Sequence, residues 1–296
     1  MQTDMITSFK KLILCAYCAL GIVACSDKDA PMDPIAQNGM LPGEFSVSAH
    51  CKVHFSQGNL QYQSSTGVWQ FATYQWDAIG KDALINHDDW RDLFIWGEDL
   101  TRVTTTDTLT FFEWGKYPIR NGGNKADEWR TLSMEEWRYL FHGRKNAKSL
   151  FGFGEVYGVN GVIILPDNWF EQSDTYTFNA SDNTGLIWKS NYYIGSGNDT
   201  VYYYYYLYDN DDKIFSHNKY TAKKWHEMEL AGAVFLPAAG NYLEEMNGGR
   251  PVGEYGNYWS STRFGNDVYC LNFYQAGLLP MCHGRNDYCF SVRLVR

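Results

Sequence analysis

The sequence predicts an α+β domain built from short strands, two main helices and long loops. Two segments carry apolar residues at helical spacing, whereas many short runs of aromatic and β-branched residues have the spacing of strands. Of the 296 residues, 45% are hydrophobic and 20% are charged, which is typical of a folded globular chain. Aromatic residues make up 17% of the chain, so we expect a core that contains many rings.

Residues 1–24 have the pattern of a lipoprotein signal peptide. Lys10 and Lys11 precede an apolar run that is too short to span a bilayer, as in secretory signals. The end of this run, Ile22–Cys25, resembles a lipobox, which implies cleavage before Cys25 and lipid attachment to its thiol. An ordinary cleaved signal peptide with an incidental cysteine is the alternative.

The next segment, residues 25–44, is predicted to be a tether. It is rich in Asp, Pro, Gly and Asn and lacks periodicity, so we expect it to hold the domain away from the membrane. Its acidic start, Ser26–Asp29, resembles the export signal of surface lipoproteins of Gram-negative gut anaerobes. We therefore expect an outer membrane location, with a lipid anchor at Cys25 and exposure at the cell surface.

Strands are predicted from residue 45 onward, within one domain that covers residues 45–296. Apolar and polar residues alternate over Phe45–Ala49, and Gln57–Asn59 is a turn signal before Leu60–Gln63, which together indicate a β-hairpin. Trp69 and Phe71 indicate another strand. Later runs of the same kind are Val162–Leu165, Tyr202–Tyr206, Ala233–Leu236 and Phe290–Val295.

The two helices are predicted at residues 133–142 and 223–230. Ser133 and Glu136 form a capping-box pattern, in which each side chain can bond the other residue's backbone amide. Apolar residues then recur at helical spacing until Gly143. In the second segment, Trp225 and Met228 are expected to face the core.

Charge and motifs exclude several classes of function. The net charge of −9 argues against nucleic acid partners and against docking on anionic lipid through a basic face. We find no serine–histidine–aspartate order, P-loop or dinucleotide motif, and no histidine at zinc-site spacing. Asp209–Asp212 lacks the glycine and the distal glutamate of an EF-hand. We expect no cofactor, no metal and no enzymatic activity.

Two segments resemble the formylglycine-generating enzyme family. Trp129–Tyr139 is similar to its capped helix, and Phe290–Arg296 is similar to its terminal strand. The resemblance implies a C-type lectin-like fold, whose first and last strands pair. It would place Phe45–Ala49 beside Phe290–Val295. An active enzyme of this kind needs a cysteine pair, for which Cys282 and Cys289 are the candidates, but Asn257–Ser261 replaces the enzymes' characteristic block.

A longer set of blocks resembles the Fibrobacter major paralogous domain family of gut-bacterial lipoproteins. It includes Val53–Tyr62, Gly232–Gly240 and Tyr258–Thr262. Some members of that family are targets of diversity-generating retroelements, whose adenine mutagenesis cannot convert Asn-type codons to Lys, Glu, Gln, Met or Trp. Arg263–Cys289 contains no Lys, Glu or Trp, and its Gln275 and Met281 would have to be constant positions. The resemblance thus implies a hypervariable, ligand-binding window, in which the cysteines are codon outcomes.

The composition of this window is that of a paratope, with tyrosine rings, adaptable asparagines and arginine forks. Strand alternation sets Tyr269, Leu271 and Phe273 apart from Cys270, Asn272 and Tyr274, and we expect Leu271 and Phe273 to be core. The candidate ligand-binding residues are Arg263, Phe264, Asn266, Asn272, Tyr274, His283, Arg285, Asn286 and Tyr288.

Three functions remain open at this point. The first is a surface-tethered lipoprotein that binds an external protein or glycan through C-terminal loops. The second is a structural or assembly subunit of the cell envelope, and the third is an oxidase of the formylglycine-generating type. The pairing of Cys51, Cys270, Cys282 and Cys289 also stays open, because four cysteines allow three connectivities.

Overall fold

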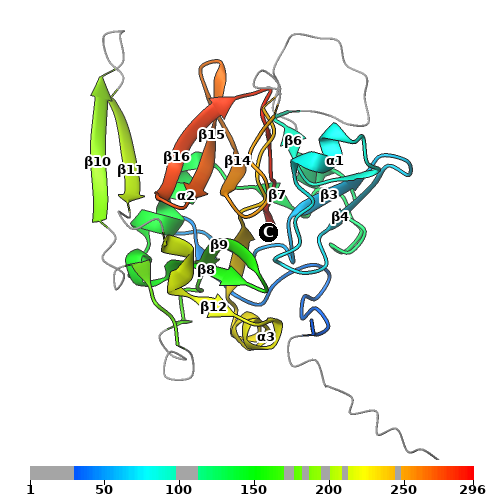
Figure 1. The fold of residues 1–296 in the computed structure, drawn as a ribbon, viewed down its shortest axis with the longest axis horizontal. Coiled ribbons are helices and arrows are strands. Elements are labelled where there is room, and N and C mark those ends of the chain that lie inside the picture. Colours follow the sequence, from blue (N-terminus) through cyan, green and yellow to red (C-terminus); the bar gives the residue numbers. More distant parts are fainter. Residues whose placement is uncertain are drawn as a thin grey trace, which may run out of the picture.

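The computed structural model has the mixed α+β architecture that the sequence predicts (Figure 1). It describes residues 30–97, 113–169, 177–181, 187–194, 201–208, 213–243 and 248–296. The predicted signal peptide, Cys25, the first residues of the tether and Asp209–Asp212 lie outside the described residues. No helix of the described part is long and apolar enough to cross a membrane.

Two larger sheets contain the longest strands of the described residues (Figure 1). The five-stranded sheet has the order β10 (Ile187–Ile194), β11 (Val201–Tyr208), β16 (Gly277–Arg285), β15 (Asp267–Tyr274), β14 (Tyr255–Phe264). The four-stranded sheet has the order β12 (Lys219–Tyr220), β8 (Phe151–Val156), β9 (Val159–Ile164), β13 (Val234–Pro237). In these sheets only β12 and β8 pair in parallel. The predicted tyrosine run thus lies in β11.

Smaller sheets complete the fold. A three-stranded sheet contains β4 (Val68–Phe71), β3 (Leu60–Gln63) and β5 (Trp90–Arg91). The two-stranded sheets are β1 (Phe45–Ser46) with β2 (Lys52–Val53), β17 (Cys289–Phe290) with β6 (Phe94–Ile95), and β18 (Leu294–Val295) with β7 (Arg130–Thr131). The β3–β4 hairpin confirms the strands expected at Leu60–Gln63 and at Trp69 and Phe71.

Both predicted helices are present. The first is α2 (Met134–Arg138), and its capping box forms: Ser133 Oγ accepts from the Glu136 amide at 3.3 Å, and Glu136 Oε2 accepts from the Ser133 amide at 2.8 Å. It continues to Gly143 as a π-helical turn, in which the Arg144 amide donates to the Tyr139 carbonyl at 2.9 Å.

The second predicted helix is α3 (Ala222–Leu230), which begins one residue earlier than expected. Thr221 caps it by accepting a hydrogen bond from the Lys224 amide. The helix α1 (Lys81–Ile85) was not predicted, and it starts at Gly80 without a side-chain cap. Short 3-10 turns at Trp114–Lys116, Ala147–Ser149 and Ile214–His217 complete the helical structure of the described residues.

Three clusters of buried side chains hold these elements together. The first contains Trp137 of α2 with Phe273 of β15, and the second contains Trp259 of β14 with Phe290 of β17. The third packs α3 against the four-stranded sheet. That sheet is covered on both faces, since Val162 belongs to the first cluster and Ile163 to the third. This explains why Val162–Leu165 is an unbroken apolar run.

The prediction that Phe45–Ala49 pairs with the C-terminal strand is wrong. Phe45 pairs with Val53 instead, because the chain turns back where the Val47 amide donates to the Cys51 carbonyl at 3.0 Å. The segment beside the C-terminus is His54–Ser56: Phe55 bridges to Val295, and the His54 amide donates to the Arg296 carbonyl at 2.8 Å. The N-terminal and C-terminal parts of the domain therefore meet, but the N-terminal segment that takes part begins at His54, about nine residues after the predicted Phe45.

Candidate functional site

The window singled out in the sequence folds into an antiparallel meander of β14, β15 and β16 (Figure 1). Two register shifts interrupt it. One lies in β14 between Trp259 and Arg263, where Ser260 Oγ accepts from the Thr262 amide at 3.1 Å and donates to the Tyr269 carbonyl at 2.8 Å. The block Tyr258–Thr262 thus builds a bulge that bends the strand.

The second register shift lies between β15 and β16. Cys270 is opposite Cys282, whereas Asn272 is opposite Leu279, so β16 holds one extra residue. Pro280 lies in this stretch, and proline is tolerated at bulges because it cannot donate to the ladder. Bulges increase the local twist, and the two ends of the meander therefore meet different neighbours.

Both faces of the meander are covered, at different ends. Leu271 and Phe273 are fully buried in the first cluster, which confirms the prediction that they are core. Cys270, expected to face outward with Asn272 and Tyr274, is only 2% exposed because it lies in the second cluster. Tyr269, expected on the inward face, is half-buried. The assumption of a single covered face was wrong.

Seven of the nine candidate ligand residues come to one end of the meander, where β14 turns into β15 and β16 ends. These are Arg263, Phe264, Asn266, His283, Arg285, Asn286 and Tyr288. We define the tip surface as the first five of these together with Asp267 and Tyr269. The other two of these seven candidates, Asn286 and Tyr288, lie in the turn that follows β16.

Aromatic rings form the centre of the tip surface. The Phe264 ring centroid lies 5.0 Å from that of Tyr269 and 4.7 Å from that of His283. His283 Nδ1 is 3.0 Å from Asp267 Oδ2, and Tyr269 is directly opposite His283 in the ladder. All four side chains are half-buried. Cross-strand contacts of this kind hold the rings in place and leave part of each accessible.

Cationic and amide side chains surround these rings. Arg263, Asn266 and Arg285 are exposed. The Arg263 guanidinium donates to the Gly265 carbonyl at 3.2 Å, and Arg285 Nε donates to Asp287 Oδ1 at 3.1 Å. Rigid rings beside exposed arginine forks and an asparagine form a surface that can bind a polar partner without a deep cavity.

The remaining two candidates, Asn272 and Tyr274, lie at the opposite end of the meander. Asn272 Nδ2 donates to Asn257 Oδ1 at 2.8 Å, and the Tyr274 ring stacks on that of Tyr255 at 5.1 Å. We call these four residues the base. Seven positions of one strand separate Asp267 from Tyr274, which is about 23 Å at 3.3 Å per residue. The structure therefore does not bring the nine candidates into one patch.

Sequence reasoning missed two members of the tip surface. No local sequence motif marks Asp267. The strand register brings its carboxylate next to His283, and the sequence alone does not show that register. Tyr269 was placed on the core side because it alternates with Leu271 and Phe273. Tyr269 does lie on the same face as Leu271 and Phe273, but it does not belong to the first buried cluster.

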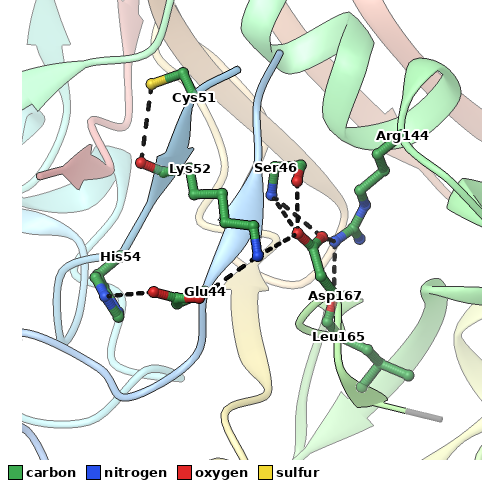
Figure 2. A network of polar contacts seen from close by, with 8 residues as sticks. All are labelled: Glu44, Ser46, Cys51, Lys52, His54, Arg144, Leu165 and Asp167. Atoms are coloured by element: carbon green, nitrogen blue, oxygen red, sulfur yellow. Dashed lines mark hydrogen bonds and ion pairs between the residues drawn. The ribbon is translucent and has the colours of Figure 1, made fainter. Parts of the chain in front are cut away.

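A charged cavity of about 440 Å³ lies elsewhere, beside the N-terminal strand. Its carboxylates pair with Lys52, whose Nζ is 3.5 Å from Glu44 and 3.6 Å from Asp167, and the His54 ring lies 3.9 Å from Glu44 (Figure 2). Asp167 also accepts from Ser46 Oγ at 2.6 Å and from Arg144 at 3.3 Å.

Arg144 and Asp167 join the N-terminal strand to the interior. The Arg144 guanidinium is buried and donates to the carbonyls of Leu140, Leu150 and Leu165. Burial lowers the pKa of Arg144 to about 10. Burial raises the pKa of Asp167, but hydrogen bonds from Ser46 and the charge of Arg144 outweigh it and hold that pKa below its usual value. These contacts serve the fold and leave no charge of the network unmatched.

A second cavity, of about 400 Å³, lies near the base. It is lined by Glu155, Asn160, Lys213, Phe215, Ser216, Lys219, Gly253, Glu254 and Gln275. Lys219 Nζ is 3.0 Å from Glu155 Oε2, so charges of opposite sign pair here too.

The described part of the chain contains no group of three or more His, Cys, Asp or Glu that could hold a metal ion. Cys51, Cys270, Cys282 and Cys289 are present as thiols. Cys282 faces Cys270 across the ladder, whereas Cys289 pairs with Ile95 and bridges to Tyr242.

No family model, curated protein or solved structure matches this chain. The fold and the site therefore define the protein only as a mixed α+β chain with an aromatic and cationic surface on its C-terminal meander.

Proposed function

We propose that this protein is a surface-exposed lipoprotein that binds an external protein or glycan through the tip surface. The signal and lipobox pattern ending at Cys25 supports an anchor in the outer membrane. The observation that carries the binding function is the cluster of Phe264, Tyr269 and His283, surrounded by exposed arginine and asparagine side chains. Such surfaces bind through rigid rings and adaptable polar groups.

The proposal includes a C-type lectin-like fold. Two arrangements support it. The first is the meeting of His54–Ser56 with the C-terminal strand. The second is the packing of α2 beside the meander, where Trp137 Nε1 donates to the Trp259 carbonyl at 3.4 Å and the Met134 amide donates to Thr262 Oγ1 at 3.1 Å.

We also propose that a diversity-generating retroelement varies the tip. The burial pattern supports this proposal. Tyr258 and Trp259 before the window and Val292 after it are fully buried, so packing constrains these flanking positions. Within the window, packing constrains Val268 and Leu271, whereas Arg263 and Asn266 are exposed. Deep sequencing of these codons in a growing population and in sister isolates should show substitutions at the exposed tip positions and none at the buried ones. Uniform invariance would contradict diversification.

The binding function is tested with two multiple variants of the full chain. The tip variant is Phe264→Ala/His283→Ala/Arg285→Ala, and the matched base variant is Asn272→Ala/Tyr274→Ala. Each is applied to a printed glycan array and to a displayed random-peptide library. We expect the wild type and the base variant to retain the same probes and the tip variant to lose them at least tenfold. Equal retention by the tip variant, with its circular dichroism unchanged, would place binding elsewhere.

A further inference from the structure

Two cysteines occupy a geometry that suits a covalent bond. Cys270 of β15 and Cys282 of β16 are directly opposite each other in the antiparallel ladder. Directly opposite residues in such ladders have Cα atoms about 4.5–5.5 Å apart, which lies inside the range found in disulfides, about 4.4–6.8 Å. The backbone register therefore places the two cysteines within disulfide range.

We propose that Cys270 and Cys282 form a cross-strand disulfide when the protein meets a low-molecular-weight disulfide, such as oxidised glutathione. The two thiols differ in burial, and this difference sets which of them reacts first with the small disulfide. Cys282 is half-buried and packs against the second cluster, whereas Cys270 is 2% exposed and belongs to that cluster. The attack therefore begins at Cys282.

The protonation of the pair agrees with this order. The hydrogen bond from Cys270 lowers the pKa of the Cys282 thiol, and burial raises the pKa of Cys270. Because the thiolate is the nucleophile, Cys282 is the more reactive member.

The exchange balances in two steps. The Cys282 thiolate attacks one sulfur of oxidised glutathione, which releases one glutathione thiolate and leaves a mixed disulfide on Cys282. The released glutathione thiolate takes up the proton of Cys270, and the Cys270 thiolate attacks Cys282 Sγ, which releases the second glutathione as a thiolate. Two protein thiols are oxidised, and one glutathione disulfide is reduced to two thiols.

The bond would fix the strands that carry the tip surface. The next pair toward the tip is Tyr269 with His283, so a covalent link at Cys270 holds their register. The link also lies beside the bulge of β16, where the ladder is irregular. The inference concerns only the cysteines, so it can fail while the ligand proposal stands, and the reverse also holds.

One tryptic peptide tests the bond directly. Trypsin cleaves after Arg263 and Arg285, and the peptide Phe264–Arg285 holds Cys270 and Cys282 but neither Cys51 nor Cys289. The full chain is incubated with oxidised glutathione, denatured with N-ethylmaleimide present, and digested. We expect this peptide to be unlabelled and lighter by two hydrogen atoms than its reduced form, while Cys51 carries either the label or one glutathione. A peptide labelled at both cysteines, or a bond from Cys282 to Cys289, would overturn the proposal.

Thermal unfolding gives the second measurement. A link over a loop of this length should raise the midpoint of unfolding of the oxidised chain by about 5–10 °C over the reduced chain. Cys282→Ser should abolish this difference between oxidised and reduced protein, and Cys51→Ser should keep it. The comparison is made within each variant, so a loss of stability caused by the serine itself does not obscure the result. If oxidation shifted the unfolding midpoint equally in both variants, the proposed Cys270–Cys282 bond would be wrong.

Discussion

The two ends of the β14–β15–β16 meander share strands and alternation but differ in what covers them. At the base, Asn272 bonds Asn257, Tyr274 stacks on Tyr255, and the neighbouring Phe273 is fully buried. At the tip, the rings of Phe264, Tyr269 and His283 contact one another and remain half-buried. Residue type does not distinguish the ends, since both carry aromatic and amide side chains.

The difference teaches where this chain can change its surface at small cost. A residue packed by several elements contributes to the free energy of folding, and its replacement leaves a cavity or an unmatched polar group. A residue whose side chain is exposed contributes less. The exposed tip positions Arg263, Asn266 and Arg285 should therefore tolerate more substitutions than the buried Phe273.

The largest difference in the free energy of unfolding is expected between alanine substitutions of two phenylalanines. Phe273→Ala should lower the free energy of unfolding by about 3–5 kcal/mol, because the ring is fully buried. Phe264→Ala should cost about 1 kcal/mol, because the ring is only half-buried. Urea unfolding of both variants measures the difference. Similar losses would show that the tip is packed as tightly as the base.

A glycine sharpens the comparison at the base. An added Cβ at Gly256 would overlap the Phe273 ring, so Gly256→Ala should cost about 1–3 kcal/mol through overpacking. If the ring is the cause, Gly256→Ala should cost less in a Phe273→Leu background than in the wild type. A double-mutant cycle measures this coupling, and strictly additive losses would assign the effect to the backbone of β14.

The asparagines test the polar contacts at each end. Asn272→Ala removes the donor to Asn257, whose side chain is buried, and should cost about 1–3 kcal/mol. Asn266→Ala in the exposed turn should change the free energy of unfolding by about 0.5 kcal/mol or less. Both values come from the same urea titration. A larger loss for Asn266 would reverse the assignment of the two ends.

The smallest effect is expected for a tip cation. Arg285 and Asp287 form an exposed ion pair, so Arg285→Ala should change the free energy of unfolding by about 0–1 kcal/mol. Salt screens such pairs, and the difference from wild type should shrink further in 1 M sodium chloride. A substantial loss that persists at high salt would mean that Arg285 supports the fold.

Local patterns in the sequence predicted the elements whose contacts span a few residues. The capping box of α2 joins Ser133 to Glu136, and it forms as predicted. The second helix was predicted one residue short at its start, and its Thr221 cap was not predicted. The buried positions Leu271 and Phe273 also followed from alternation together with side-chain type. By contrast, α1 begins at Gly80 with no side-chain cap, and no local signal identified it.

The sequence by itself therefore determined the capped helix α2, the approximate place of α3, the β3–β4 strands and which residues share a face of β15. Only the tertiary structure decided that Cys270 is buried, that Tyr269 is half-buried, and that His54–Ser56 instead of Phe45–Ala49 meets the C-terminal strand. The physical reason is that alternation is a property of one strand, whereas burial and pairing depend on what packs against it. Those neighbours include α2 and β6, which are distant in the sequence, and β17 at the end of the window, and no spacing within the window encodes their packing.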